Sequence, residues 1–284
     1  MKVMVLGASG MLGNAVFRLL ADSSGIQVTG TMRSRALLPR LREDLRSKVL
    51  ADVDVEQFDS LARAFAQVRP DAVVNCIGLV KQLADADDPL VALPINALLP
   101  HRLARLCDVA GARLVHVSTD CVFSGDRGMY VESDLPDARD LYGRSKLLGE
   151  VDYPNAVTLR TSIVGHELAS AHGLVGWFLA QQGTVRGYTR AIFSGLPTVE
   201  LATVIRDNVL GNPSLHGLYH VATAPIAKRD LLDLVAKQYG LSTLIEPDDR
   251  LKIDRSLNGS RFSRATGWTA PDWPELVRRM HAFG

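Results

Sequence analysis

Residues 2–13 read KVMVLGASGMLG, a short apolar run followed at once by Gly7, Gly10 and Gly13. The run has no polar alternation, which is typical of a strand buried on both faces of a parallel sheet, and helix-spaced apolar residues follow it. Glycines between a strand and a helix permit a tight turn and let backbone amides approach a pyrophosphate. The stretch predicts a dinucleotide-binding loop formed by Gly7, Ser9, Gly10, Met11, Leu12 and Gly13.

The same alternation of strand and helix patterns continues through the first half of the chain. Further strands are predicted at 26–31, 71–75, 113–117 and 156–160, and helices around 58–68, 91–110 and 141–150. This rhythm predicts an α/β fold with a doubly wound, Rossmann-like parallel sheet. Beyond it, glycines and prolines become frequent. We expect a cofactor-binding domain over 1–165 and a smaller substrate-binding lobe over 166–284, some of whose segments pack back on the sheet.

Composition excludes several classes of protein. Lys and Arg number 32 and Asp and Glu 31, so no overall field favours nucleic acid or an anionic membrane. The three cysteines are scattered and no histidines have ligand spacing, so neither a disulfide framework nor a metal site is expected. The N-terminal apolar run is too short for a signal peptide or a membrane span. The expected location is the cytoplasm.

The end of the second strand indicates which nicotinamide cofactor is bound. It reads Thr31-Met32-Arg33-Ser34-Arg35, without the carboxylate that accepts hydrogen bonds from a ribose 2′-hydroxyl. Arg33, Ser34 and Arg35 can hold a 2′-phosphate instead, which favours NADP(H) over NAD(H). A solvated basic loop is the alternative. Other expected cofactor contacts are Asp52 and Val53 near the adenine, Cys76, Ile77 and Gly78 near the ribose, and also Val117, Tyr142 and Lys146.

A tyrosine and a lysine, Tyr142 and Lys146, lie four residues apart on a predicted helix and so project from one face. A tyrosine hydroxyl has a pKa of about 10, and a nearby ammonium makes it a better proton donor. The same ammonium can bind the cofactor ribose. Thr119 lies just after the strand at 113–117, where doubly wound sheets present active-site groups. The alternative interpretation of the pair is a surface tyrosine beside a solvated lysine.

Three segments, 115–125, 142–150 and 160–162, together with the G-x-x-G-x-x-G loop, resemble the dTDP-4-dehydrorhamnose reductase-like family of the extended short-chain dehydrogenases. The resemblance implies an NAD(P)H-dependent reductase of a 4-keto-6-deoxy nucleotide sugar. It implies Thr119 as an orienting hydroxyl, Tyr142 as proton donor and Lys146 as its partner. Substrate contacts are expected from Thr119, Asp120, Ile163 and Arg261.

Three positions depart from that family. Ile163 replaces an aromatic residue, Cys121 replaces a tyrosine, and Ala15 replaces a glutamate of a metal-bridged dimer. Cys121 also stands where dehydratases of this type carry a glutamate base, which disfavours dehydration. A nucleotide-sugar epimerase with bound NAD and a non-catalytic nucleotide-binding regulatory subunit remain alternatives. A homodimer remains open.

Overall fold

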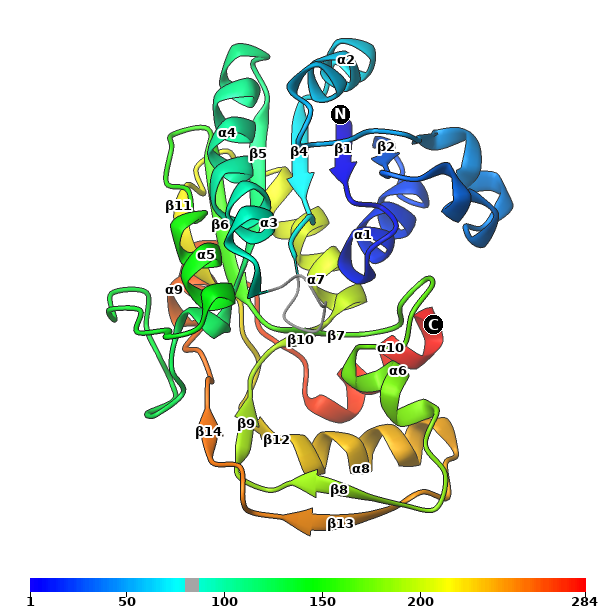
Figure 1. Ribbon diagram of the computed structural model, residues 1–284, viewed down its shortest axis with the longest axis vertical. Helices are drawn as coiled ribbons and strands as arrows, with labels where there is room; N and C mark the ends of the chain where they lie inside the picture. Colours follow the sequence, from blue (N-terminus) through cyan, green and yellow to red (C-terminus); the bar gives the residue numbers. More distant parts are fainter. Residues whose placement is uncertain (80–86) are drawn as a thin grey trace.

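The computed structural model describes residues 1–79 and 87–284. A seven-stranded sheet forms its larger layer, in the order β11-β6-β5-β4-β1-β2-β3 (Figure 1), and every adjacent pair in it is parallel. The order reverses between β1 and β4, which confirms the predicted doubly wound sheet. Its strands are β1 (Lys2–Leu6), β2 (Gln27–Thr31), β3 (Val49–Leu50), β4 (Ala72–Asn75), β5 (Arg113–Thr119), β6 (Ala156–Thr161) and β11 (Gly217–His220).

Both faces of the sheet are covered, as the unbroken apolar run in β1 predicts. Side chains alternate along a strand. Val3 and Val5 pack in one core with helix α1 (Met11–Ala21), whereas Met4 and Leu6 pack in a second core with α2 (Phe58–Val68) and α4 (Leu99–Val109). Residues 3–6 of β1 are therefore all apolar because the strand lies between two helical layers.

The helix predicted around 91–110 is built from three segments. These are α3 (Pro89–Ala92), the π-helical turn η4 (Leu93–Leu98) and α4. A π-helical turn inside a helix shifts the side chains that follow it, and such turns are frequent at functional sites. Here it carries Asn96, which is buried beside the candidate site.

The C-terminal half divides between a lower lobe and the main sheet (Figure 1). The lobe contains a three-stranded sheet, β12 (Ile226–Ala227), β9 (Ala191–Phe193) and β14 (Ile253–Asp254), and the pair β8 (Thr184–Tyr188) and β13 (Leu244–Asp248). Its core joins α6 (Leu174–Leu179), α8 (Lys228–Tyr239) and α10 (Trp273–Phe283). By contrast, α7 (Thr198–Val204) and the π-helical turn η6 (Ile205–Leu210) pack in the core of the main sheet, and β11 extends that sheet.

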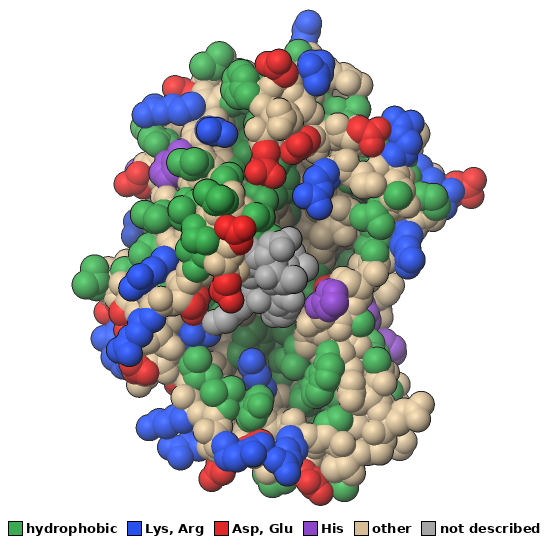
Figure 2. All heavy atoms as spheres, in the orientation of Figure 1, with side chains coloured by type: hydrophobic (Ala, Val, Ile, Leu, Met, Phe, Trp, Pro, Cys, Tyr) green, Lys and Arg blue, Asp and Glu red, His purple; other side chains and the backbone are tan. Residues whose placement is uncertain are grey.

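Figure 2 shows a hollow between the upper layer and the lower lobe, with hydrophobic side chains around it and basic side chains on the lower lobe. The carboxyl ends of the parallel strands point toward this hollow, which is where open α/β sheets bind ligands (Figure 1). Within 1–79 and 87–284, no helix has both the length and the apolar character needed to cross a membrane.

Candidate active site

The glycine loop between β1 and α1 has the close backbone packing that only glycine permits. Gly7 has φ +82°, in the left-handed region, and its amide oxygen accepts a hydrogen bond from the Gly10 amide at 2.9 Å. A β-carbon on Gly13 would overlap the carbonyl oxygen of Gly7. Helix α1 begins at Met11 without a side-chain cap or an acidic first turn. Its first amides are therefore available to an anion.

The basic turn after β2 is partly neutralised. The guanidinium of Arg35 forms an exposed ion pair with Asp52, whose carboxylate also accepts from the Arg35 amide at 3.3 Å. The Ser34 hydroxyl oxygen accepts from the Ala36 amide and begins a short 3-10 helix. Arg33 is exposed and forms no ion pair among the described residues. The structure thus brings Arg35 and Asp52 together, whereas Arg33 extends into solvent.

The end of β4 lies between the glycine loop and the candidate lysine. A β-carbon on Gly7 would stand 2.9 Å from the Ile77 side chain. One on Gly78 would stand 3.8 Å from the Nζ atom of Lys146. Cys76 is partly buried, and burial raises the pKa of its thiol to about 12. The two predicted cofactor segments and the lysine therefore lie along one continuous surface.

Thr119, Tyr142 and Lys146 come together at the end of β5. Helix α5 (Leu141–Leu148) is capped by Asp140, whose carboxylate accepts from the Gly143 amide at 2.8 Å. Lys146 Nζ donates to the Val117 carbonyl oxygen at 2.9 Å, and the Thr119 hydroxyl lies close enough to Tyr142 to oppose the rise in its pKa. Tyr142 and Lys146, which their spacing placed on one helix face, thus lie at the carboxyl end of β5.

Burial governs the ionisation of this group. Lys146 is 5% exposed, and burial lowers its pKa to about 8, although the Glu150 carboxylate acts in the opposite direction. Burial also raises the pKa of the Tyr142 hydroxyl. At neutral pH the Tyr142 hydroxyl therefore keeps its proton, and Lys146 is mostly cationic.

The turn after Thr119 holds a second set of polar groups. Asp120 is 6% exposed, and burial raises the pKa of its carboxyl while the Arg255 charge lowers it. Cys121 lies beside α5, because a β-carbon on Gly143 would overlap its carbonyl oxygen. Arg255 Nη1 approaches the Cys121 sulfur at 3.6 Å. Arg255 was not among the predicted site residues, since only the tertiary structure brings it to this turn.

Asn96, in the π-helical turn η4, makes three side-chain hydrogen bonds. Its side-chain oxygen accepts from the Leu79 amide at 2.9 Å, and its amide nitrogen donates to the Leu79 carbonyl oxygen and the Ser145 hydroxyl. Because both ends of the amide are used, Asn96 fixes the segment that follows β4 against α5. The structure assigns it to positioning, and no hydrogen bond joins it to Lys146 among the described residues.

A buried polar network one turn beyond Lys146 was missed by sequence reasoning. Glu150 accepts from Ser118 at 2.6 Å and from two nitrogens of Arg160, which is 2% exposed. Arg160 Nη1 donates to His220 Nε2 at 2.9 Å, so His220 Nδ1 is the donor to the Tyr130 carbonyl oxygen. An arginine within a buried strand was the available sequence signal.

Two expected substrate residues lie away from these contacts. Ile163 begins the short strand β7 (Ile163–Val164), which pairs with β10 (Leu196–Pro197) where the chain enters the lower lobe. Arg261 lies on α9 (Ser260–Thr266), exposed, with its guanidinium 4.8 Å from the centre of the Tyr219 ring on β11. Their roles toward a substrate stay predictions.

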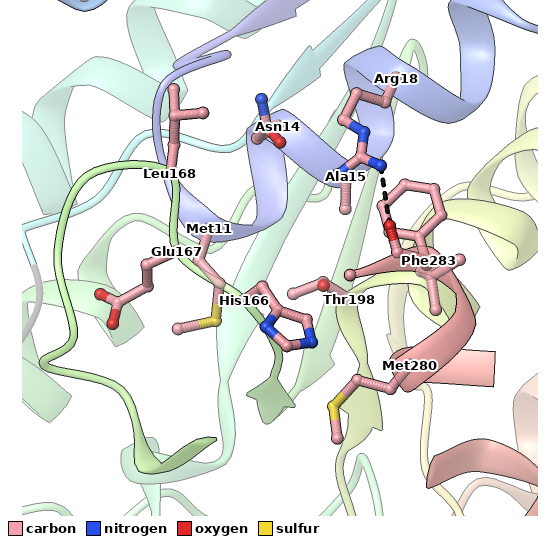
Figure 3. Close-up of a pocket in the computed structure, with 12 residues that line it drawn as sticks. Met11, Asn14, Ala15, Arg18, His166, Glu167, Leu168, Thr198, Met280 and Phe283 are labelled. Atoms are coloured by element: carbon pink, nitrogen blue, oxygen red, sulfur yellow. Dashed lines mark hydrogen bonds between the residues drawn. The ribbon is translucent and has the colours of Figure 1, made fainter. Parts of the chain in front are cut away.

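A pocket of about 200 Å³ lies between α1, the loop at 166–168 and the end of α10 (Figure 3). Met11, Ala15 and Arg18 face His166 and the end of α10 across it, and Arg18 donates to the Phe283 carbonyl oxygen at 2.8 Å. Ala15 contributes only a methyl group. Over the two described ranges, no three His, Cys, Asp or Glu side chains cluster as a metal site would require.

The parallel sheet, glycine loop and Thr-Tyr-Lys group define an oxidoreductase of the extended short-chain dehydrogenase type. The chain belongs to the family described as the RmlD substrate binding domain, which it matches over residues 1–264.

Similar proteins include reductases and a subunit of a methionine adenosyltransferase. The probable low-salt glycan biosynthesis reductase Agl14 of Haloferax volcanii is 30% identical and is aligned over 90% of this chain and 86% of its own length. The methionine adenosyltransferase 2 subunit beta of Xenopus laevis is also 30% identical, over 77% of this chain and 66% of its own length. The dTDP-4-dehydrorhamnose reductase of Bacillus anthracis in complex with NADP shares the fold, with a TM-score of 0.80, 20% identity and coverage of 99% and 98%.

Proposed function

We propose that this protein is an NADPH-dependent reductase of a 4-keto-6-deoxy sugar linked to dTDP or UDP. The observation that carries the proposal is the convergence of Thr119, Tyr142 and Lys146 at the carboxyl end of β5, with Lys146 on the Val117 carbonyl oxygen. The reductase Agl14 and the family's fold support it. We place the reaction in the cytoplasm.

The residues that follow the carboxyl ends of β1, β2 and β4 leave room for a dinucleotide. The glycine loop excludes β-carbons where a pyrophosphate would approach, and Gly78 leaves space beside Lys146. We assign the pyrophosphate to the loop, the 2′-phosphate to Arg33 with Ser34 and Arg35, and the adenine to Asp52 and Val53. Cys76, Ile77 and Gly78 would line the ribose. When bound, the cofactor supplies the hydride.

The protein's own groups would direct that hydride and supply the proton. Thr119 donates a hydrogen bond to the carbonyl oxygen of the substrate and orients it. Tyr142 then transfers its proton to the developing alkoxide, and the Lys146 ammonium stabilises the phenolate left behind. We also assign substrate contacts to Asp120 and Ile163.

The test is turnover. The protein is incubated with NADPH and 4-keto-6-deoxy sugars linked to dTDP, UDP or GDP, and the loss of absorbance of the reduced nicotinamide is followed. Reduction of a dTDP- or UDP-linked sugar supports the proposal. Absence of turnover with every sugar, under conditions where NADPH binds, would contradict it.

A regulatory role is the second candidate, because the similarity to the methionine adenosyltransferase beta subunit extends over 77% of this chain. It predicts nucleotide binding without turnover. It also predicts that the Tyr142→Phe substitution leaves the partner enzyme's activity unchanged.

A further inference from the structure

Asn75 on β4 and His116 on β5 lie opposite each other in the centre of the sheet, and both side chains are fully buried. The preceding pair on the same face, Val73 and Leu114, is apolar and belongs to the core under α2 and α4. Polar side chains in such a place cost free energy unless their polar atoms are hydrogen-bonded. Core packing alone therefore gives no reason for a polar pair at this point of the sheet.

The hydrogen bonds of the pair have a direction that is set by a backbone amide. The Ile77 amide donates to Asn75 Oδ1 at 3.1 Å. Because a backbone N–H can only donate, Asn75 must turn its Nδ2 toward the ring of His116, where it lies 3.1 Å from Nδ1. His116 Nδ1 is then the acceptor, and the ring proton is on Nε2. Nε2 is buried without a hydrogen-bond partner among the described residues, so the bond to Asn75 is the one that the ring makes there.

Only the neutral form of His116 can accept this hydrogen bond. A protonated ring carries N–H on both nitrogens, so its Nδ1 would face the Asn75 amide as donor against donor. Burial lowers the pKa of His116 well below its usual value, and the charges of Lys146 on α5 and His101 on α4 act in the same direction. His116 is therefore neutral at neutral pH, as the hydrogen bond requires.

The anchored amide belongs to the segment between the glycine loop and the candidate lysine. A β-carbon on Gly7 would stand 2.9 Å from the Ile77 side chain, and one on Gly78 would stand 3.8 Å from Lys146 Nζ. A rotation of the peptide at Ile77 would therefore change the packing against the loop and the space beside the lysine together. The position of this one amide affects both ends of the surface assigned to the cofactor.

We propose that His116 is a positioning residue for cofactor binding, which accepts a hydrogen bond from Asn75 and so fixes the Ile77 amide in the wall that lines the cofactor ribose. The proposal rests on the cofactor contacts assigned under the proposed function, and it holds for any ketosugar. His116 has no exposed surface, so it acts through Asn75 and not by contact with a ligand.

The experiment compares two substitutions that each keep one of the two polar positions of the ring. His116→Asn puts an amide oxygen where Nδ1 lies, whereas His116→Gln puts its amide near the position of Nε2 and loses the Nδ1 acceptor. Fluorescence titration of the full chain with NADPH measures the affinity. We expect His116→Gln to weaken NADPH binding by about tenfold, the loss of one buried hydrogen bond, and His116→Asn to stay within about threefold of the unaltered protein. Equal affinities in the two variants would overturn the positioning role.

Leu103→Ala is the matched control for stability. Leu103 on α4 is fully buried in the same core as Val73 and Leu114, and its truncation leaves a cavity there. We expect a lower Tm with unchanged NADPH affinity. If Leu103→Ala weakens NADPH binding as much as His116→Gln does, the effect belongs to the stability of the core, and the proposal is wrong.

The tautomer of His116 supplies a test that needs no variant. Long-range ¹H–¹⁵N NMR spectra of the unaltered protein, saturated with NADP⁺, should show His116 protonated at Nε2 alone at pH 7. A proton on Nδ1, or on both nitrogens, would overturn the proposal, because Nδ1 could then not accept from Asn75.

These outcomes are separate from those of the proposed function. Loss of NADPH affinity in His116→Gln alone, without turnover of any ketosugar by the unaltered protein, supports the positioning role and contradicts the reductase. Equal NADPH affinities in His116→Gln and His116→Asn, with ketosugar reduction intact in the unaltered protein, overturn the positioning role and leave the reductase.

Discussion

Arg160 and Glu150 form a buried ion pair one helical turn beyond Lys146, with Nη2 of Arg160 2.5 Å from Oε2 of Glu150. The pair links β5 to β11, because Glu150 accepts a hydrogen bond from Ser118 on β5 and Arg160 donates one to His220 on β11. Because Glu150 also opposes the lowering of the Lys146 pKa, the same carboxylate serves the fold and the candidate active site.

Breaking this ion pair should destabilise the protein strongly. Glu150→Gln leaves the Arg160 charge buried without its partner, and we expect the free energy of unfolding to fall by about 3–5 kcal/mol. Asp207→Asn, which breaks the more exposed Arg206 pair, is the matched control and should cost at most about 1 kcal/mol. Denaturant unfolding measures both. Equal small losses would show that the buried pair contributes little.

The rate of ketosugar reduction should decline on the alkaline side. Lys146 has a pKa of about 8, so its ammonium loses a proton as the pH rises above that value, and the phenolate loses its stabilising charge. Burial raises the pKa of Tyr142, so that group does not ionise in this range. A profile of kcat/KM between pH 6 and 10 should show the decline. A rate that stays constant to pH 10 would exclude Lys146 from this role.

Glu150→Gln should move that alkaline decline to lower pH. The groups that face Lys146 include Glu150, the Cys76 thiol and the neutral His116 ring, and the carboxylate is the one that holds the lysine pKa up most. Removal of the Glu150 charge therefore lowers the pKa of Lys146 and favours its neutral amine. The comparison is made at a temperature where the variant remains folded. An unchanged midpoint would assign Glu150 to the ion pair alone.

Substitutions in the catalytic group should follow a definite order. Tyr142→Phe removes the proton donor but keeps the ring, so the rate should fall by about 10²–10⁴ with cofactor affinity nearly intact. Thr119→Val should cost less, because it loses one hydrogen bond and no proton source. Lys146→Met should reduce both cofactor affinity and rate. Full activity in Tyr142→Phe would remove this tyrosine from the mechanism.

Cofactor preference should depend more on Arg33 than on Arg35. The Asp52 carboxylate already pairs with Arg35, whereas Arg33 has no ion pair among the described residues. Arg33→Ala should lower the preference for NADPH over NADH by about tenfold or more, and Arg35→Ala by less. Arg40→Ala, in the same exposed segment, is the control. Fluorescence titration with both cofactors measures the ratio, and equal affinities in the unaltered protein would contradict the NADPH assignment.

Features encoded by neighbouring residues could be predicted from the sequence. The glycine loop lies between its own strand and helix, and Tyr142 and Lys146 share a helix face because they are four residues apart. Thr119 lies on a different element from Tyr142 and Lys146, but it could be predicted as their neighbour because parallel strands present their carboxyl ends on the same side of the sheet. The π-helical turn at Asn96 was not predicted, since apolar periodicity does not distinguish it from an ordinary helix.

The sequence by itself determined the five central strands of the sheet, the glycine loop and the Tyr142–Lys146 pair, because each depends on spacing within one strand, loop or helix. Only the tertiary structure decided that Arg160 meets His220, 60 residues later, and that Arg255 meets Cys121, 134 residues earlier. It also decided that β11 joins the main sheet beside β6. These contacts depend on how the C-terminal segments pack and in which register they pair, and that is set by the buried surface of the whole molecule.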